Sequence, residues 1–443
     1  MRKIAVFISS SRIEGLFSQS NIFSQIKDEY DVTLFYFNSE RSNTNQRNVK
    51  TIRIKASKYS AKFQKFVLDV ESYHYRSSNI SFASRIRIIT NLNVKENLNI
   101  FSFIKAKSFY GLCISVFSAS ILYPFLSRFM KFISDVIPLI TNPRLMATDY
   151  DLGIVLSGGN FSSMENSVGR LLRFRKTPSL LLIDNWDNLS SKSVIWNKPN
   201  KILVWGENMK EDAVKVHDIK EDNVVISGSY RLMNPPKSRR ESTIKFIYFI
   251  GSGLQHSYEM EILMHLSIYL SNHYETKIEI IYRPHPFSIR NQRLLFLLQQ
   301  LAHFANIQVD SDIILNESNA FYSENSLNHL AQMVLNSEMV VATHSTVIVE
   351  ALYFGKKVVA FSKAEHGVFC DQNLWDMYTH LKQIKNFSNL SESVDRITFF
   401  REVLSNLQYT DVFNSVDYSA ISRNTKNYSK ILSDVSFNLI SRK

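Results

Sequence analysis

Cysteine, glycine and proline are all scarce in this chain. Its two cysteines, Cys113 and Cys370, form no Cys-x-x-Cys pair. A secreted protein of this length more often carries several disulfides, so we expect a reducing, cytoplasmic environment. The 12 glycines and 9 prolines among 443 residues are too few for a collagen-like or linker-dominated chain. Hydrophobic residues make up 45% and charged residues 21%, which indicates a folded protein.

Long uncharged runs are also rare. The N-terminal apolar run Ile4–Ile8 is too short for a signal peptide and predicts a first buried strand. One run of membrane-spanning length extends from Ser108 to Ser127, but several serines, Gly111 and Pro124 interrupt it and disfavour a spanning helix. We therefore expect either an amphipathic element at a membrane surface or ordinary core helices of an enlarged domain.

Basic residues outnumber acidic ones, 52 to 40, which gives a formal net charge of +12. This excess favours an anionic partner: a nucleic acid, a membrane face or a phosphorylated substrate. The sequence has no RNA-binding signature, zinc-finger spacing or single long basic stripe, so we expect no nucleic acid partner. The basic and aromatic stretch Lys58–Lys131 predicts a partner of another kind, the anionic inner-membrane surface.

Apolar runs alternate with helical patterns over most of the chain. A first series predicts strands over Ile4–Ser9, Val32–Phe37, Thr51–Ile54, Leu152–Leu156, Ser179–Ile183, Lys201–Val204 and Val224–Ile226. A second series predicts strands over Phe246–Ile250, Glu279–Tyr282, Ile307–Val309, Met339–Ala342 and Val358–Phe361. Strands that alternate with helices form parallel sheets covered on both faces. The fold class predicted is therefore α/β, with two Rossmann-like domains.

The segment Met233–Arg240 separates the two series. It contains two consecutive prolines and several charges, which predicts a linker. We expect an N-terminal Rossmann-like domain over residues 1–232, with a helical insertion at about 55–142, and a C-terminal Rossmann-like domain over 243–413. Residues 414–443 are expected to form a helix that crosses back to the first domain.

A hydroxyl-rich turn follows the predicted strand Met339–Ala342. The turn consists of Thr343, His344, Ser345 and Thr346, and the helix after it carries Glu350 and ends at Gly355. Ligands bind at the carboxyl ends of strands in open parallel sheets, and hydroxyls and free N–H groups at a helix start can bind phosphate. Plain helix capping explains the same residues equally well.

Two prolines enclose a histidine in the segment Tyr282-Arg283-Pro284-His285-Pro286. The prolines prevent helix formation on either side and hold His285 at the end of a strand. A fixed histidine beside Arg283 suits a phosphate that gains charge as it leaves. A loop histidine that serves only in packing is the alternative.

Gly251, Ser252 and Gly253 follow the first strand of the second series. Such a turn lets the backbone approach a phosphate, although glycines after strands are also common turn formers. Four acidic residues of the first series are candidates for a general base that deprotonates a hydroxyl: Glu14, Glu165, Asp184 and Asp187. Each of them is also explained as a cap or turn residue.

The His285-Pro286 pair and the later strand–Ser/Thr–helix–Glu–Gly unit resemble GT-B glycosyltransferases of bacterial surface-polysaccharide synthesis. Relatives of this type include sialyl-, polysialyl- and Kdo transferases and, more loosely, CDP-glycerol polymerases. The resemblance covers roughly residues 150–365. It implies that His285, Ser345 and Thr346 contact the donor phosphate, and that Glu350 binds the ribose of the nucleotide.

The resemblance implies a GT-B fold, with two domains facing a cleft, and an inverting glycosyltransferase. The donor would be a nucleotide sugar bound by the C-terminal domain. The acceptor would be a glycan or lipid-linked glycan of lipopolysaccharide, O-antigen or capsule, bound by the N-terminal domain. We expect no cofactor and no required metal, because Asp149-Tyr150-Asp151 precedes its strand and Asp310-Ser311-Asp312 lies late in the second series.

Three other functions fit the same motifs. A nucleotide-sugar epimerase shares the fold, but it acts on a small soluble donor and needs no basic, aromatic insertion. A CDP-alditol phosphotransferase is the second alternative. The third is a nucleotide-binding scaffold of polysaccharide assembly, against which the presence of His285 and Glu350 argues.

Overall fold

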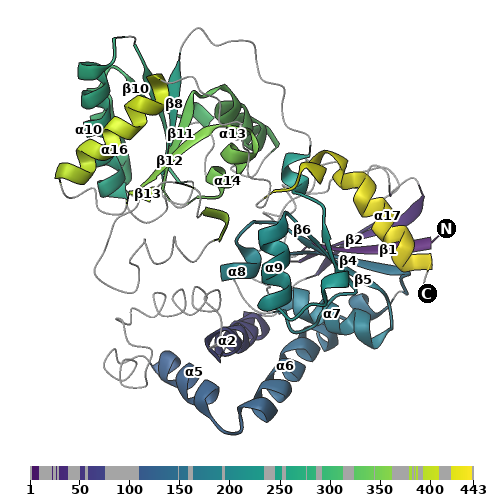
Figure 1. The fold of residues 1–443 in the computed structure, drawn as a ribbon. Coiled ribbons are helices and arrows are strands. Elements are labelled where there is room, and N and C mark those ends of the chain that lie inside the picture. Colours follow the sequence, from purple (N-terminus) through teal and green to yellow (C-terminus); the bar gives the residue numbers. More distant parts are fainter. Residues whose placement is uncertain are drawn as a thin grey trace. The chain divides into compact units, whose positions relative to one another are not determined.

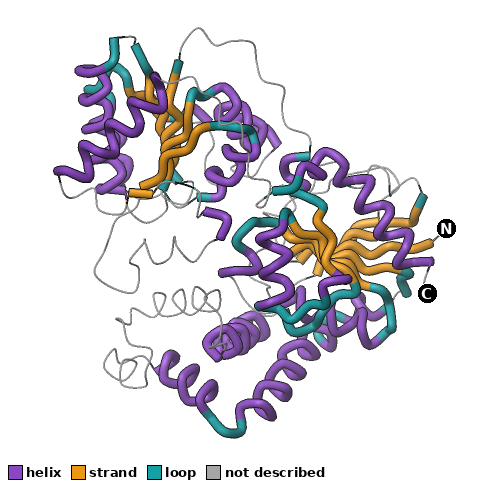
Figure 2. Tube along the Cα trace, in the orientation of Figure 1, coloured by secondary structure: helices purple, strands orange, loops and turns teal. Residues whose placement is uncertain are grey.

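The computed structural model describes residues 2–8, 22, 26, 29–37, 50–54, 58–74, 109–147, 149–157, 163–191, 195–233, 245–251, 256–275, 277–285, 292–312, 324–343, 345–361, 379–381, 384, 386–387, 393–408 and 421–441. The chain divides into two compact units. Unit 1 comprises Met1–Asn234 and Ser419–Lys443, and unit 2 comprises Pro235–Tyr418. Each unit contains a parallel sheet flanked by helices (Figures 1 and 2). The predicted α/β class is confirmed.

Unit 1 is built on a sheet whose seven described strands are all parallel, in the order β3-β2-β1-β4-β5-β6-β7. Their bounds are β1 (Arg2–Ile8), β2 (Tyr30–Phe37), β3 (Lys50–Ile54), β4 (Leu152–Ser157), β5 (Ser179–Ile183), β6 (Lys201–Val204) and β7 (Val224–Ile226). The central strands β4 and β5 are buried along their whole length. Continuous apolar runs such as Leu180–Ile183 are typical of strands covered on both faces.

The α-helices described in unit 1 are α2 (Lys58–His74), α5 (Phe109–Ala119), α6 (Tyr123–Ile140), α7 (Ser163–Phe174), α8 (Asn188–Ser191), α9 (Glu207–Lys215) and α17 (Tyr428–Ser441). The first three, α2, α5 and α6, lie within the predicted insertion. The uncharged run from Ser108 to Ser127 is divided between α5 and α6, with a break at Ser120–Leu122. None of the helices formed by the described residues is long and apolar enough to cross a membrane.

Buried polar contacts attach the inserted helices to unit 1. Ser127 of α6 donates a 2.6 Å hydrogen bond to Glu71 of α2, which also pairs with Lys131. Asp135 of α6 is fully buried and accepts a 2.7 Å hydrogen bond from Arg170 of α7. Burial raises the pKa of Asp135, although hydrogen bonds from its neighbours, including Arg170, partly offset this. These helices are therefore an integral layer of unit 1.

Unit 2 repeats the same topology with the described strands in the order β10-β9-β8-β11-β12-β13, again all parallel. The strands are β8 (Phe246–Ile250), β9 (Glu279–Arg283), β10 (Ile307–Val309), β11 (Met339–Ala342), β12 (Lys357–Phe361) and β13 (Asn386–Phe387). The helices are α10 (His256–His273), α11 (Gln292–Leu301), α13 (Glu324–Asn336), α14 (Thr346–Tyr353) and α16 (Ser393–Gln408). Figure 1 shows α10 and α16 on one side of the sheet and α13 and α14 on the other.

The strand order reverses at one point in each sheet, between β1 and β4 in unit 1 and between β8 and β11 in unit 2. Helices connected to strands on either side of such a point diverge to opposite faces of the sheet. In open α/β sheets, ligands bind near such a point, at the carboxyl ends of the two central strands.

The C-terminal segment packs on unit 1, far in sequence from its other elements. Ser422 N–H donates a 2.7 Å hydrogen bond to the Trp205 carbonyl, and the Ser229 N–H donates to Thr425 Oγ1 at 3.1 Å. Tyr428 at the start of α17 stacks edge-on against Tyr230, with the ring centroids 5.9 Å apart. Aromatic packing and backbone hydrogen bonds together hold this segment in place.

We predict that Gly228→Ala destabilises unit 1 by about 2–5 kcal/mol, as expected for a left-handed residue combined with overpacking. Gly228 has a φ of +79°, and an added Cβ would overlap Thr425 Oγ1 and lie 2.6 Å from the Thr425 Cα. Urea unfolding followed by circular dichroism measures the change.

Gly355→Ala is the matched control. Gly355 also has a positive φ (+71°), but an added Cβ there would have no neighbour within 4 Å. The cost should therefore be limited to the backbone strain, about 1–2 kcal/mol. Equal destabilisation by the two substitutions would mean that the contact with Thr425 does not hold the C-terminal segment.

Candidate functional site

Several of the predicted ligand-binding residues lie at the carboxyl edge of the unit 2 sheet. Gly251 follows β8, His285 follows β9 after Pro284, and Thr343 follows β11. Because β9, β8 and β11 are neighbours and parallel, these positions share one edge of the sheet. His285 is half-buried, whereas Gly251 and Thr343 are buried. The reversal of strand order between β8 and β11 falls within this group.

The turn after β11 leads into the N-terminus of α14. Ser345 is the N-cap of α14, and its Oγ accepts a 3.3 Å hydrogen bond from the Val347 N–H. Thr343 is 3% exposed, and its hydroxyl has no hydrogen-bond partner in the part of the chain that the structure describes. The partial positive charge of a helix start and an uncommitted hydroxyl both favour an anionic or hydroxyl-bearing ligand.

Glycine is required at position 251 by packing. The Gly251 N–H donates a 2.9 Å hydrogen bond to the Arg283 carbonyl, which extends the pairing of β8 with β9. An added Cβ would lie 2.6 Å from Glu259 Oε2 and 2.9 Å from the Tyr282 hydroxyl. The N–H of Gly251 is therefore used inside the sheet, and the glycine allows the strand end to approach α10 closely.

Arg283 is held by two carboxylates. Its guanidinium is 6% exposed and lies 2.7 Å from Asp310 Oδ2 and 3.1 Å from Asp312 Oδ2. The Tyr248 hydroxyl donates to the same Asp310 oxygen at 2.6 Å. His329 Nε2 lies 2.7 Å from the other oxygen, Asp310 Oδ1. The cluster joins the ends of β9 and β10 to the middle of β8 and to α13; we call it the Asp310 cluster.

The contacts within the Asp310 cluster keep both Arg283 and Asp310 charged. Burial by itself would raise the pKa of Asp310, but the hydrogen bond from His329 and the charge of Arg283 outweigh it and hold that pKa well below its usual range. Burial opposes the charge of Arg283, yet Tyr248 and Asp310 outweigh it and raise the pKa of the guanidinium. Burial also raises the pKa of Tyr248, so its hydroxyl remains a donor.

Sequence reasoning did not find the Asp310 cluster. Asp310-Ser311-Asp312 was considered only as a metal motif, whereas its carboxylates bind Arg283. The sequence did contain one signal. An Asp-x-Asp pair directly follows one predicted strand, and Arg283 directly follows another. Parallel strands that are neighbours bring such residues together. Among the described residues, no three His, Cys, Asp or Glu side chains are placed to hold a metal ion.

The candidate bases Asp184 and Asp187 lie in the buried turn after β5 in unit 1. Asp184 Oδ1 accepts a 2.8 Å hydrogen bond from the Tyr230 hydroxyl. Burial and the charge of Asp184 raise the pKa of Tyr230 well above its usual value. Asp187 Oδ1 accepts a 2.8 Å hydrogen bond from Asn185. Both carboxylates thus help to shape the carboxyl edge of the unit 1 sheet.

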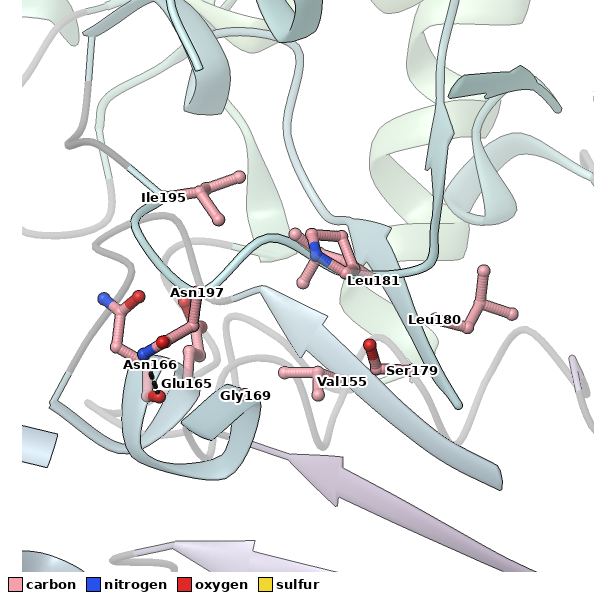
Figure 3. A pocket seen from close by; sticks show the side chains of 10 residues that line it. Val155, Glu165, Asn166, Gly169, Ser179, Leu180, Leu181, Ile195 and Asn197 are labelled. Atoms are coloured by element: carbon pink, nitrogen blue, oxygen red, sulfur yellow. Dashed lines mark hydrogen bonds between the residues drawn. The ribbon is translucent and has the colours of Figure 1, made fainter. Parts of the chain in front are cut away.

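Glu165 stands in the first turn of α7 and faces a small cavity (Figure 3). The cavity lies between α7, β5 and the segment 195–199, where Asn197 donates a 2.7 Å hydrogen bond to the Asn166 carbonyl. Its volume of about 20 Å³ has room for about one water molecule. A nucleotide or a sugar does not fit in it.

Other predicted residues are distributed as follows. Thr346 is the first residue of α14, and Glu350 lies in the same helix, 5% exposed. Glu14, Ser252, Gly253 and His344 lie outside the described residues. The structure therefore brings Gly251, His285, Ser345 and Thr346 to one edge of unit 2, and Asp184 and Asp187 to the carboxyl edge of unit 1.

We predict that Asp310→Asn lowers the stability of unit 2 by about 3–5 kcal/mol at pH 7, because it leaves Arg283 buried without its main counter-charge. The Asp310 contribution is present above the pKa of an unfolded Asp and is lost as the pH falls below about 4. The difference between wild type and variant should therefore narrow in acid, which urea unfolding at several pH values would measure.

Glu211→Gln serves as the control for this prediction. Glu211 forms an exposed i,i+4 pair with Lys215 on α9, and such pairs add little to stability. If Asp310→Asn were as stable as the wild type at pH 7, or were destabilised no more than Glu211→Gln, the buried pair would not hold the strand ends.

Comparison of the sequence with protein-family models and with curated proteins found no match. Comparison with solved structures found similar architectures over nearly the whole chain. MnaA of S. aureus, solved with UDP, is 10% identical, with a TM-score of 0.51, over 99% of this chain and 97% of its own. A UDP-GlcNAc 2-epimerase from Methanocaldococcus jannaschii is 10% identical, with a TM-score of 0.51, over 98% and 99%.

A Listeria monocytogenes protein described as a UDP-N-acetylglucosamine 2-epimerase is 9% identical, with a TM-score of 0.54, over 98% of this chain and 96% of its own. At such low identity the similarity establishes the fold and not the activity. The chain has the GT-B fold of these nucleotide-sugar enzymes, with two α/β domains built on parallel sheets.

Proposed function

We propose that the protein is an inverting, metal-independent glycosyltransferase that takes a sugar from a nucleotide donor. The observation that carries the proposal is the carboxyl edge of unit 2, where His285 and the Ser345-capped start of α14 flank the reversal of strand order. The partial positive charge at the start of a helix and nearby hydroxyl groups both favour binding of the donor phosphates. His285 is proposed to stabilise the charge that develops as the nucleotide leaves.

The roles of the surrounding residues are proposed from their contacts. Arg283 acts as a positioning residue, because both sides of its guanidinium are occupied by Asp310 and Asp312. Ser345 and Thr346 contact the donor phosphate, and Glu350 binds the ribose. For the base we favour Asp184 and Asp187, since both follow β5 at the carboxyl edge of the unit 1 sheet, whereas Glu165 faces a cavity with room for about one water molecule.

The acceptor is proposed to be a glycan or lipid-linked glycan of the bacterial cell surface. The three helices α2, α5 and α6 support this, because they enlarge unit 1 beyond what a small soluble donor requires. The second candidate function is nucleotide-sugar epimerisation. Two of the similar structures described above carry that name, and this observation favours it.

Two measurements separate these functions. Isothermal titration with CMP, CDP, UDP and GDP identifies the nucleotide, with UDP expected first because MnaA was solved with it. The matching nucleotide sugar is then followed by NMR, with and without a glycan acceptor fraction. A transferase leaves the nucleotide sugar unchanged until the acceptor is added. Conversion without an acceptor would establish the epimerase, and no binding of any nucleotide would reject both.

We predict that His285→Ala lowers turnover by about 100-fold or more, as the loss of one preplaced hydrogen-bond donor does in other enzymes. Nucleotide affinity should fall much less, because Ser345 and Thr346 still hold the phosphate. Initial rates and isothermal titration measure the two effects.

His303→Ala is the control for this substitution. His303 is exposed in the turn that precedes β10, at the opposite edge of the same sheet, and its loss should leave turnover unchanged. Near-normal turnover of His285→Ala, with the protein still folded, would assign His285 to packing.

A further inference from the structure

One side of α6 presents large apolar side chains to solvent. Together with the two residues before the helix they form a surface that we call the outer α6 face. Its members and exposed fractions are Ile121 (97%), Leu122 (64%), Phe125 (72%), Phe129 (56%), Phe132 (49%) and Ile140 (71%). Within α6, Phe125, Phe129 and Phe132 follow one another at intervals of four and three residues, so they lie along one side of the helix. Single exposed apolar residues are ordinary, but a contiguous row of this size marks an interaction surface.

The outward side of α6 is more apolar than that of a normal surface helix, and its inward side is mixed. The inward side buries Met130 and Leu139 together with the polar residues Ser127, Ser134 and Asp135. Two of these polar side chains are used inside unit 1: Ser127 bonds Glu71, and Asp135 binds Arg170. At Ser134 the backbone carbonyl accepts a hydrogen bond from Gln64. A helix in water would place phenylalanines inward and serines outward. The sequence of α6 therefore matches an environment that is apolar on the outside.

The exposed charges around the outer α6 face are mostly basic; the exception is Asp149, whose fully exposed carboxylate lies 3.6 Å from Arg175. Between Phe109 and Ala147 the described residues include three cations, Arg128, Lys131 and Arg144, and one anion, Asp135, which is fully buried. Arg128 and Arg144 are exposed. At the end of α7, Phe174 is 80% exposed between basic neighbours, and the next residue, Arg175, hydrogen-bonds the Met146 carbonyl. The apolar row is thus bordered by positive charge.

We propose that the outer α6 face inserts into the interfacial region of an anionic lipid bilayer, with α6 lying in the plane of the membrane. Phenylalanine, leucine and isoleucine side chains would enter the boundary between headgroups and acyl chains, and Arg128 and Arg144 would meet lipid phosphates. The 18 residues of α6 give a contact about 27 Å long. Ile121, the most exposed of the six, lies in the turn at Ser120–Leu122 that joins α5 to α6.

The contacts make this attachment mainly hydrophobic. Two lysines of the basic stretch are already neutralised, since Lys65 pairs with Asp69 at 2.7 Å and Lys131 pairs with buried Glu71. The remaining exposed cations add an electrostatic contribution that salt screens, whereas burial of the phenylalanines is insensitive to salt screening. The attachment requires no nucleotide and is independent of the reaction that the protein catalyses.

The test is flotation of the full-length protein with phosphatidylcholine vesicles, with and without phosphatidylglycerol. The wild type should float with the anionic vesicles and more weakly with the neutral ones. High salt should weaken its binding to the anionic vesicles without abolishing it. A Phe125→Ser/Phe129→Ser variant should bind anionic vesicles at least about tenfold more weakly, as expected from the loss of two buried aromatic side chains. Its melting temperature and nucleotide affinity should match the wild type, because both rings are exposed.

A Leu295→Ser/Phe296→Ser variant is the matched control, because these residues are 46% and 59% exposed on α11 of unit 2. It should float like the wild type. Absence of wild-type flotation, or equal flotation of the α6 variant, overturns the proposal. The proposal is also overturned if sedimentation analysis shows a dimer that the α6 substitutions abolish. The face would then bind a second copy of the chain.

Discussion

The buried ion pair between Arg283 and Asp310 is the interaction on which the geometry of unit 2 depends. It joins the end of β9 to the end of β10, and Tyr248 in the middle of β8 bonds the same carboxylate, so one group connects three strands. His285 lies two residues beyond Arg283, and Gly251 bonds the Arg283 carbonyl. A charge pair in a buried site tolerates no loss of either partner. The pair therefore fixes the strand end from which His285 follows and to which Gly251 bonds.

The strands were predictable because parallel, doubly covered strands are continuous apolar runs. Ser179–Ile183 and Met339–Ala342 have the predicted bounds, and β1 and β12 differ by a residue or two at their ends. The two-residue strand β13 was missed, since Asn386–Phe387 is too short to show any periodicity. Within the range 55–142, the described helices α2, α5 and α6 have the predicted helical character, but the outward position of the phenylalanines of α6 could not be read from the sequence.

The candidate site was predictable only as far as strand ends and topology determine it. A residue after a parallel strand lies at the carboxyl edge, which located Gly251, His285 and Ser345. The partners of a side chain depend on contacts between distant segments, which no local pattern contains. Arg283 was thus assigned to the donor phosphate, although Asp310 and Asp312 occupy its guanidinium. Glu165 likewise faces a cavity that only the packing of α7 against β5 creates.

The return of the C-terminal segment to unit 1 has a consequence for how the protein is made. Trp205 and Gly228 are synthesised long before Ser422 and Thr425, which they contact. Unit 2 lies wholly between these two parts of the chain, so it can complete its own contacts while unit 1 still lacks its last segment. Unit 1 therefore reaches its final packing only after the whole of unit 2 has been synthesised. Until then Tyr230 lacks the aromatic contact that Tyr428 provides.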